Sequence, residues 1–320
     1  MLDYVGSTFN GDPVEFDDII QPFNLLAGRK TGPAISGRLS RLGPLVEDVI
    51  IRHNYPEVVS VIIGESLAMG ATLAGALKFS GVFTLQMQGD GPVSLVVVDI
   101  STPDEGNTFR LRSYAKYDKE KLQMFDKPNA RDLLGNGYLA LTVDQGENTE
   151  RYQGLVELVG HTVSEFAQHY FRQSQQMDAA VMVSAGRDSV SGSWRAACIM
   201  LQRVADDKLE SLPSDEEDDP WRRNMMLLAT GTDKEMLDPA LDPRHYLYRL
   251  FHEEGLRVLP VRSLSRGCRC SEERITLVLK QLPKEELLDF LVEGAVEVTC
   301  EFCNSVYLFD PETFERCNTN

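Results

Sequence analysis

The longest apolar stretch of the chain follows helical spacing. Over residues 56–77 apolar positions recur at intervals of three and four, and many of them are small. Pro56 suits the first turn of a helix. Small side chains let neighbouring elements approach closely, so the stretch is predicted to form a buried, closely packed helix. The wider stretch 58–79 contains Glu65 and Lys78, which argues against a membrane span.

The pattern then changes to alternation, which is typical of strands. Phe83, Leu85 and Met87 alternate with polar residues, and turn-forming residues 89–92 separate them from a second apolar run at 95–100. This arrangement predicts a β-hairpin. The other elements predicted here are short amphipathic helices at 37–49 and 162–174, and strands at 138–143, after 151–154, at 180–183 and at 196–204. Antiparallel hairpins mixed with helices indicate an α+β core over residues 1–205.

The composition changes after this core. The acidic run 215–219 is typical of a solvated linker, and two helices are predicted after it, at 221–229 and 243–254. Residues 206–256 are therefore predicted to form an acidic, helical linker. The remaining residues, 257–320, contain five of the six cysteines and are predicted to form a small C-terminal domain.

Two closely spaced cysteine pairs carry the clearest chemical signal. Cys268 and Cys270 enclose one residue, whereas Cys300 and Cys303, which follow after 29 intervening residues, enclose two. A tetrahedral four-cysteine zinc site requires two such pairs, because each pair supplies one edge of the tetrahedron. The sequence therefore predicts one Zn²⁺ ion on these four thiols.

The residues leave two roles open for this zinc. A domain of roughly 60 residues with few large apolar side chains needs a staple, which favours a structural site. Alternatively, the site is a redox switch, because oxidants attack thiolates and disulfide formation would release the metal. Release would remove on the order of 10 kcal/mol of binding energy that a small metallodomain uses to fold.

The local charge does not decide between these roles. Basic residues that favour thiolates flank the first pair, and acidic residues that oppose them flank the second: Arg262, Arg266, Arg269 and Arg274, and then Glu297 and Glu301.

The overall charge argues against nucleic acid and lipid as partners. The chain has 32 basic and 49 acidic residues, a formal net charge of −17. Residues 261–310, which span the predicted zinc site, have six basic and nine acidic residues. Nucleic acid and anionic membranes both require a basic surface. The first 18 residues lack the basic start and apolar run of a signal peptide, so a cytoplasmic location is expected.

Other candidate residues carry weaker signals. Residues 64–68 resemble the nucleophile elbow of a serine hydrolase, with Ser66 as the nucleophile. The final glycine of that motif is absent and the same residues fit the predicted helix, so the hydrolase is a remote alternative. Cys198 lies in an apolar strand pattern and is predicted to be buried and inert. Cys317 is predicted to be exposed.

The cysteine pairs occur together with short segments in a fixed order, which covers the chain from about residue 70 to 310. These segments are 77–81, 88–92, 135–138, 151–154, 249–254 and 307–309. With this pattern the chain resembles the heat shock protein 33 family, whose members are redox-regulated holdase chaperones.

The resemblance implies a mechanism. In the reduced, inactive state zinc is bound by Cys268, Cys270, Cys300 and Cys303. Oxidation forms the disulfides Cys268–Cys270 and Cys300–Cys303, zinc leaves, and the zinc domain and linker unfold. Unfolding client proteins are then bound and kept from aggregating. Members of the family use no ATP and are not enzymes, and the monomer tends to become a homodimer on oxidation.

This chain departs from the family pattern in places. Asn304 follows the last zinc cysteine, where many members have glycine. Asparagine tolerates the left-handed conformation that such a turn needs, so the site is expected to persist. The acidic insert at 215–219 and the extra Cys317 bear on the switching behaviour more than on the zinc site.

The predicted linker contains flexible apolar side chains: Trp221, Met225, Met226 and Leu227. We hypothesise that these residues shield or form a client-binding surface once the zinc domain unfolds. Plain packing inside the linker is the alternative. For the whole chain, a constitutive zinc-ribbon interaction module is the alternative to the switch.

Overall fold

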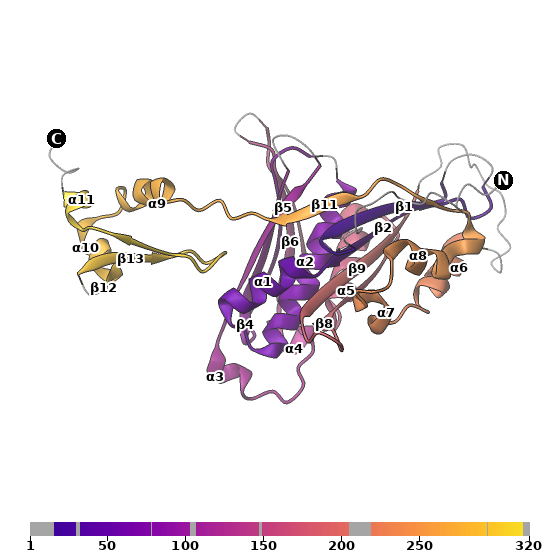
Figure 1. Cartoon of the computed structure of the whole chain (residues 1–320), viewed down its shortest axis with the longest axis horizontal. Helices are drawn as coiled ribbons and strands as arrows, with labels where there is room; N and C mark the ends of the chain where they lie inside the picture. Colours follow the sequence, from indigo (N-terminus) through magenta and orange to yellow (C-terminus); the bar gives the residue numbers. More distant parts are fainter. Residues whose placement is uncertain are drawn as a thin grey trace.

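Two halves of one broad β-sheet pack against a single long helix, and a smaller C-terminal lobe projects from the side of this core (Figure 1). The computed structural model describes residues 16–29, 33–77, 79–102, 107–146, 149–204, 219–292 and 294–315. The predicted α+β class, with a four-cysteine C-terminal domain, is confirmed.

The sheet has the strand order β7-β6-β3-β4-β5-β11-β1-β2-β9-β8, with β10 also beside β1. Strand β11 joins the two halves, because it runs parallel to β5 and antiparallel to β1. The strands are β1 (Ile19–Leu25), β2 (Ile35–Leu42), β3 (Val82–Gly89), β4 (Val93–Ser101), β5 (Phe109–Tyr117), β6 (Gly137–Asp144), β7 (Tyr152–Glu157), β8 (Ala179–Arg187), β9 (Trp194–Arg203), β10 (Leu256–Val258) and β11 (Arg262–Arg266).

The helices of the core lie on both faces of this sheet. They are α1 (Pro44–His53), α2 (Glu57–Ala76), α3 (Lys119–Leu122), α4 (Ala130–Leu134), α5 (Val163–Tyr170), the π-helix η1 (Phe171–Gln175), α6 (Pro220–Leu228), α7 (Asp233–Leu237), α8 (Pro243–Phe251) and the 3₁₀-helix η3 (His252–Glu254).

Helix α2 is the centre of the main hydrophobic core. It contacts β4 and β5 in one half of the sheet and β2, β8 and β9 in the other. The approach is close, since a Cβ on Gly64 would lie 2.8 Å from the Cβ of Ala185. The helix is long and apolar enough to cross a membrane, yet 78% of that stretch is buried inside the protein. The predicted buried helix is confirmed.

The predicted hairpin is confirmed as β3 and β4, with Leu85 opposite Val98. Phe83, Leu85 and Met87 are fully buried, and the residues between them face the other side of the sheet, as strand geometry requires. The other predicted strands appear as β6, β7, β8 and β9, and the helix predicted at 162–174 appears as α5 and η1.

The helix predicted at residues 37–49 is wrong in its first half. Those residues belong to β2, which pairs with β1 on one side and β9 on the other. Helix α1 begins only at Pro44, where proline occupies the first turn. A strand between two partners gains burial and ladder hydrogen bonds from residues distant in sequence, and this gain outweighs a local helical pattern.

Two glycine-rich turns of the family pattern pack against each other. The Asp90 backbone N–H donates to Asn136 O (3.0 Å), and the Asn136 N–H donates to Asp90 Oδ1 (2.7 Å). A Cβ on Gly89 would lie 1.9 Å from the carbonyl oxygen of Leu134, so only glycine permits this approach. These segments therefore have a structural role, which is to hold the β3–β4 turn against the start of β6.

Helices α6, α7 and α8 cover the face of β1, β2 and β9 that is turned away from α2. Trp221 and Leu228 of α6 and Tyr246 of α8 are buried there. Helices α6 and α8 confirm the two predicted helices, whereas α7 was not predicted. Asp219 caps α6 by accepting from the Trp221 N–H (3.0 Å). The rest of the acidic run, 215–218, lies outside the described residues.

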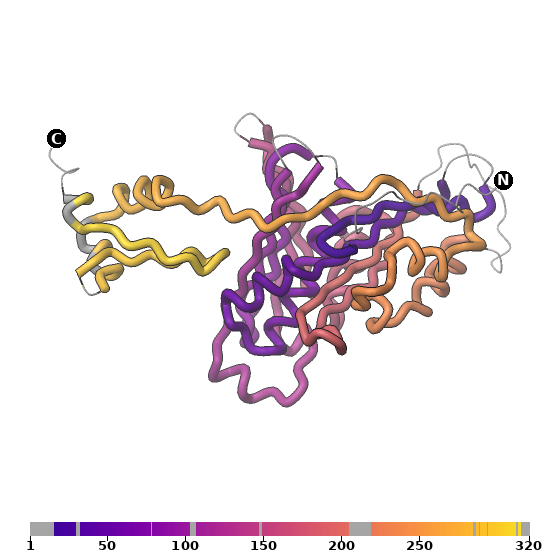
Figure 2. The backbone as a smooth tube through the Cα atoms, in the orientation of Figure 1, coloured from indigo at the N-terminus to yellow at the C-terminus, as the bar shows by residue number. Residues whose placement is uncertain are grey.

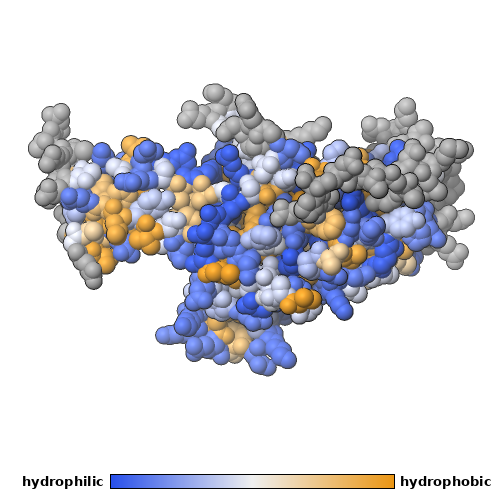
Figure 3. Space-filling view, viewed as in Figure 1, coloured by the Kyte–Doolittle hydropathy of each residue, from blue (hydrophilic) through white to orange (hydrophobic). Residues whose placement is uncertain are grey.

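The C-terminal lobe has a small core. Its elements are α9 (Glu272–Leu279), α10 (Lys284–Leu287), η4 (Leu288–Phe290), β12 (Leu291–Val292), β13 (Ala295–Thr299), β14 (Val306–Phe309) and α11 (Glu312–Glu315). Among the described residues its buried apolar side chains are Leu279, Val296, Phe309 and Phe314. Figure 3 shows apolar surface over this lobe, where Leu277 and Leu308 are 63% and 65% exposed. So thin a core is typical of a domain that needs a metal staple.

The predicted domain boundaries stay predictions. Strand β10 straddles the predicted start of the C-terminal domain at residue 257, and β11 follows it. Both strands pair with β1 of the core.

Candidate metal centre

Two separate segments bring the four predicted cysteines together. Cys268 and Cys270 follow β11 on an extended segment, and Cys300 and Cys303 lie in the turn between β13 and β14. In Figure 2 this segment leaves the core, and the β13–β14 hairpin returns toward it. The four Sγ atoms all lie within 4.8 Å of one another. The predicted cluster is therefore formed.

The sulfur spacing fits a tetrahedral metal site. Sγ of Cys268 lies 3.6 Å from that of Cys300, and Sγ of Cys270 lies 3.4 Å from that of Cys303. Zinc–sulfur bonds of about 2.3 Å place tetrahedral sulfur atoms roughly 3.8 Å apart. Cluster and geometry together mean that these thiols could hold a metal ion.

The turn that carries the second pair is closed by its backbone. The Asn304 N–H donates to Cys300 O (2.8 Å), and the Cys300 N–H donates to Ser305 O (2.9 Å). Asn304 has φ 55° and so adopts the left-handed conformation. The expectation that asparagine replaces glycine here without loss of the turn is confirmed.

The thiols of Cys270, Cys300 and Cys303 ionise unequally. Burial raises the pKa of Cys270 to about 12 and also raises the pKa of Cys300. Burial acts in the same direction on Cys303, but hydrogen bonds with the Ser305 hydroxyl and N–H outweigh it, and its pKa is lowered to about 7. Of these three thiols, Cys303 is therefore the one that ionises most readily. Metal ligation favours the thiolate form of every cysteine it involves.

Tyr307 of β14 forms a hydrogen bond with the cluster. Its hydroxyl donates to Cys270 Sγ (3.1 Å), and this bond raises the pKa of Tyr307 to about 12. The tyrosine thus stays a hydrogen-bond donor to sulfur at neutral pH. Tyr307 belongs to the family segment 307–309, but sequence reasoning gave it no role at the site.

Phe302, one of the two residues between Cys300 and Cys303, docks on the core. The Phe302 ring makes an edge contact with Tyr114, with ring centroids 4.7 Å apart, and the Arg112 guanidinium lies 3.7 Å from the Phe302 centroid. Beside it, Lys116 Nζ lies 2.7 Å from a carboxylate oxygen of Glu301. Arg112, Tyr114 and Lys116 alternate along β5 and so share one face of the strand.

Three further bonds tie the cysteine segments to the core. Asp99 of β4 accepts from Arg112 (2.5 Å) and from Arg269 (3.0 Å), which lies between Cys268 and Cys270. His53 Nε2 lies 2.9 Å from Glu301 O, and Asn304 Nδ2 donates to the backbone carbonyl oxygen of Arg52 (2.8 Å). We call Asp99, Arg112, Tyr114 and Lys116 the docking face. Sequence reasoning missed it.

Three of the six charged residues that flank the cysteines form ion pairs with the core. Arg269 pairs with Asp99, Glu301 with Lys116, and Arg266 with Asp48 of α1 (2.9 Å). From the sequence alone, the effect of these charges on the thiols did not decide between a structural site and a redox switch. The structure shows that they also hold the C-terminal lobe against β4, β5 and α1.

The remaining candidate residues lie outside the cluster. Cys198 of β9 is 1% exposed, and burial raises its pKa to about 12, so the predicted inert thiol is confirmed. Cys317 lies outside the described residues. Ser66 is fully buried inside α2, where its hydroxyl donates to Ile62 O (2.5 Å). The nucleophile elbow considered for Ser66 is wrong, because one continuous helix spans that segment.

Comparison with known proteins places this arrangement in a family. The family model described as "Hsp33 protein" matches residues 28–310. The chain belongs to the Hsp33 family. The 33 kDa chaperonin of Caulobacter vibrioides is 36% identical over 302 residues, which cover 92% of this chain and 95% of that protein. The 33 kDa chaperonin of Pseudomonas fluorescens SBW25 is 36% identical over 86% of both chains.

A solved structure agrees in fold. The crystal structure of the Hsp33 homolog from Thermotoga maritima superposes with a TM-score of 0.75 at 23% identity, covering 94% of this chain and 97% of that one. Membership in the Hsp33 family supports a chaperone function. The relatives are named as chaperonins rather than as enzymes.

In this Hsp33 chain an ion pair between the buried Glu254 and the partly exposed Arg223 joins two helices of the predicted linker. Glu254 of η3 is 5% exposed and accepts from Arg223 Nε (2.7 Å) and Asn224 Nδ2 (2.8 Å) of α6. Burial alone would raise the pKa of Glu254, but these bonds outweigh it and lower that pKa. The Glu254 carbonyl accepts from the Ala27 N–H (2.9 Å), which attaches the helices to the end of β1.

The apolar linker residues divide into two groups. Trp221 is 8% exposed and Leu227 packs at the edge of the cluster under α6. Met225 and Met226 face outward and are 36% and 57% exposed. Loss of α6 would therefore uncover the Trp221 side and the sheet beneath it, whereas the methionines are accessible already.

Proposed function

We propose that this chain is an ATP-independent, redox-regulated holdase chaperone whose four zinc-bound thiolates are the sensor. The observation that carries the proposal is the cluster of four Sγ atoms within 4.8 Å, built from the two segments that dock on the core. Zinc would be held by Cys268, Cys270, Cys300 and Cys303 in the reduced form. A borderline-soft ion with four thiolate ligands fits zinc better than Mg²⁺ or Ca²⁺, which prefer oxygen.

The proposed redox step uses peroxide as the oxidant. Each pair of zinc-bound thiolates gives up two electrons to one peroxide molecule, which takes up two protons from the solvent and becomes two water molecules, and one disulfide forms. The products are Cys268–Cys270 and Cys300–Cys303. A disulfide bond of about 2.05 Å is far shorter than the edges of a zinc-binding tetrahedron, so the metal is released.

We expect the structural effect of metal loss to be transmitted to the core through the docking face. Closing a disulfide between Cys300 and Cys303 rearranges the turn that presents Phe302 to Tyr114. The lobe keeps a core of few buried side chains and loses on the order of 10 kcal/mol of metal-binding energy. Unfolding of the lobe would displace β11 and β10. Displacement of these strands would in turn loosen α8 and η3, which precede them in the chain.

The proposed client surface is the apolar face beneath α6, α7 and α8. Its side chains include Phe23, Leu39 and Ile199 from three neighbouring strands, all at most 1% exposed. Once uncovered, this face would bind unfolding proteins during stress and keep them from aggregating. The chain is proposed to act in the cytoplasm, as a monomer when reduced and a homodimer when oxidised, without nucleic acid or membrane partners.

One observation favours a second function. The C-terminal lobe exposes large apolar side chains without any oxidation: Leu277, Val278, Phe290, Leu291, Val292, Val306 and Leu308. This surface suits a constitutive zinc-ribbon interaction module. Such a module would bind its partner equally in the reduced and oxidised states.

The test is suppression of aggregation of a chemically unfolded client, without ATP. The reduced, zinc-loaded chain is compared with the chain treated with peroxide at mildly raised temperature. We expect suppression only after treatment. A variant with Cys300→Ser and Cys303→Ser should bind less zinc and lose the redox dependence, whereas Cys317→Ser should behave as the wild type. Equal activity in both redox states would favour the interaction module and reject the switch.

A further inference from the structure

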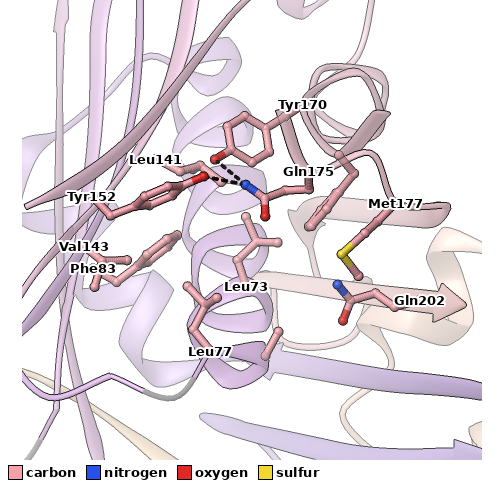
Figure 4. Close-up of a pocket in the computed structure, with 12 residues that line it drawn as sticks. Leu73, Leu77, Phe83, Leu141, Val143, Tyr152, Tyr170, Gln175, Met177 and Gln202 are labelled. Carbon is pink, nitrogen blue, oxygen red and sulfur yellow. Dashed lines mark hydrogen bonds between the residues drawn. The ribbon is translucent and has the colours of Figure 1, made fainter. Parts of the chain in front are cut away.

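A cavity of about 280 Å³ opens where the end of α2 meets η1 and the edges of both sheet halves (Figure 4). Its floor is apolar and buried, with Leu73 and Phe83 at most 4% exposed. At its mouth lie Leu77, Tyr152 and Met177, which are 39–54% exposed. Among the described residues, none of those that line the cavity comes from α6–α8 or from the C-terminal lobe, so the cavity is separate from the proposed switch.

The lining contains no charged side chain among the described residues. A carboxylate or ammonium group placed there would lose its hydration without an ionic partner, which is costly. The cavity therefore favours an uncharged occupant. In size it is almost twice an engineered cavity of roughly 150 Å³ that holds benzene, and it suits about two fused rings.

Polar groups gather at one side of the cavity. Gln175 Nε2 donates to the hydroxyl oxygens of Tyr152 (2.8 Å) and Tyr170 (3.4 Å). Figure 4 shows the Gln175 amide oxygen turned away from both tyrosines. No group in the described part of the chain donates to this oxygen. It is an acceptor available to a hydroxyl or N–H of an occupant.

An unusual backbone conformation positions the polar groups at this side of the cavity. The π-helix η1 carries Gln175, and Gln176 closes it with φ 51°, a left-handed conformation. π-Helices are rare and often occur at functional sites. Gly154 of β7 leaves room for Tyr170, because a Cβ there would lie 2.2 Å from the Tyr170 hydroxyl oxygen. The family segment 151–154 thus shapes the cavity.

We propose that this cavity is a binding site for a small uncharged amphipathic molecule, with a body of one or two rings and a hydroxyl group. The rings would pack between Leu73, Phe83 and Met177, and the hydroxyl would donate to Gln175 Oε1. Met177 is flexible and polarizable and adapts to ring faces. The site requires neither zinc release nor client binding.

The test is a fluorescence titration of the reduced, zinc-loaded full chain with 2-naphthol, with naphthalene and 2-naphthalenesulfonate as matched probes. We expect saturable binding of 2-naphthol, several-fold weaker binding of naphthalene, and roughly tenfold weaker binding of the charged sulfonate. Sulfonate binding as tight as that of 2-naphthol would overturn the proposal, because it would indicate a non-specific apolar surface.

Two variants locate the site. Ala76→Phe fills the cavity and should weaken 2-naphthol binding roughly tenfold or more. Gln175→Leu keeps the size but removes the acceptor, so it should weaken 2-naphthol about three- to tenfold and leave naphthalene unchanged. Val190→Ala, at a position 91% exposed in the β8–β9 turn, is the control.

Zinc content and thermal unfolding confirm that each variant is folded. If Ala76→Phe does not fold, the comparison of 2-naphthol with naphthalene on Gln175→Leu decides. Wild-type affinity for 2-naphthol in Gln175→Leu, or in a folded Ala76→Phe, would overturn the proposal.

Discussion

At the scale of single residues, Phe302 joins the metal centre to the core. It lies between two proposed ligands, and its ring packs on Tyr114 and under Arg112. Any change in the turn between Cys300 and Cys303 must therefore move a ring that is seated on β5. No other residue of that turn has an aromatic contact with the core in the part of the chain that the structure describes.

Phe302→Ala is expected to loosen the lobe without removing a sulfur ligand. The lost aromatic and cation–π contacts correspond to about 1–2 kcal/mol. We expect the zinc content to be unchanged, faster amide hydrogen exchange in residues 109–117, and faster zinc release by peroxide. Phe302→Tyr, which keeps the ring, is the control. Identical exchange and release rates in the alanine variant and the wild type would show that docking does not limit the switch.

Glu65 is a partly buried carboxyl group in α2 that the proposed switch does not use. Burial raises its pKa to about 7, and the nearby charge of Asp233 acts in the same direction. A raised pKa in the folded state means that the stability contributed by the protonated group is complete below the unfolded value of about 4.3. It is lost as the pH rises through about 7.

Glu65→Gln should therefore stabilise the chain above pH 7, by about 1–3 kcal/mol at pH 8, with a clearly smaller effect near pH 5. Urea unfolding of the reduced, zinc-loaded chain at both pH values measures this. Glu57→Gln, on the exposed start of the same helix, is the control. A gain that is the same at pH 5 and pH 8 would contradict the assignment.

At the scale of elements, α6 is attached by an ion pair between Arg223 and the buried Glu254 as well as by the apolar packing of Trp221 and Leu228. Glu254 accepts from Arg223 and Asn224 of α6, and its pKa is lowered because these bonds outweigh burial. A lowered pKa stabilises the folded form above the unfolded value of about 4.3, and the stabilisation is lost as the pH falls below it. At neutral pH the attachment is therefore complete.

Glu254→Gln should release α6 without oxidation. Loss of a buried charged partner costs about 1–3 kcal/mol, enough to shift a marginal helix. We expect faster amide exchange over 220–228 and client binding by the reduced, zinc-loaded variant. The neighbouring Glu253→Gln changes a side chain that is 85% exposed and is the matched control. The same exchange in both variants would mean that Glu254 does not hold α6.

The exposed methionines of α6 can be tested in the same assay. We expect the double substitution Met225→Ser and Met226→Ser to weaken client binding by the oxidised chain several-fold, because methionine adapts to varied apolar partners. Zinc content should not change. Met124→Ser, at an exposed position outside the predicted linker, is the control. Unchanged client binding would remove both methionines from the client surface.

At the scale of the whole molecule, the elements that depend only on the local pattern of apolar and polar residues could be predicted from the sequence. The helix over residues 56–77 and the alternation around Phe83 and Met87 carry their own periodicity, and the structure confirms both. The spacing of the four cysteines alone predicts a tetrahedral cluster, and in the structure their sulfur atoms lie close together. Local spacing suffices where each segment carries its own part of the signal.

What depends on long-range contacts could not be predicted. Residues 37–42 became strand because β1 and β9 lie beside them. The docking face brings together residues such as Asp99 and Arg269, which are 170 positions apart, and no periodicity connects them. The cavity beside Gln175 depends on a π-helix, for which sequence offers no clear pattern.

The central claim is that the state of the cysteine cluster controls the exposure of the core's apolar face. The most direct test is one peroxide titration in which released zinc and suppression of client aggregation are measured on the same samples. We expect suppression to rise in proportion to the zinc released, and both to reverse when a dithiol and Zn²⁺ are added. Full suppression while the zinc is still bound, or none after all of it has left, would contradict the account.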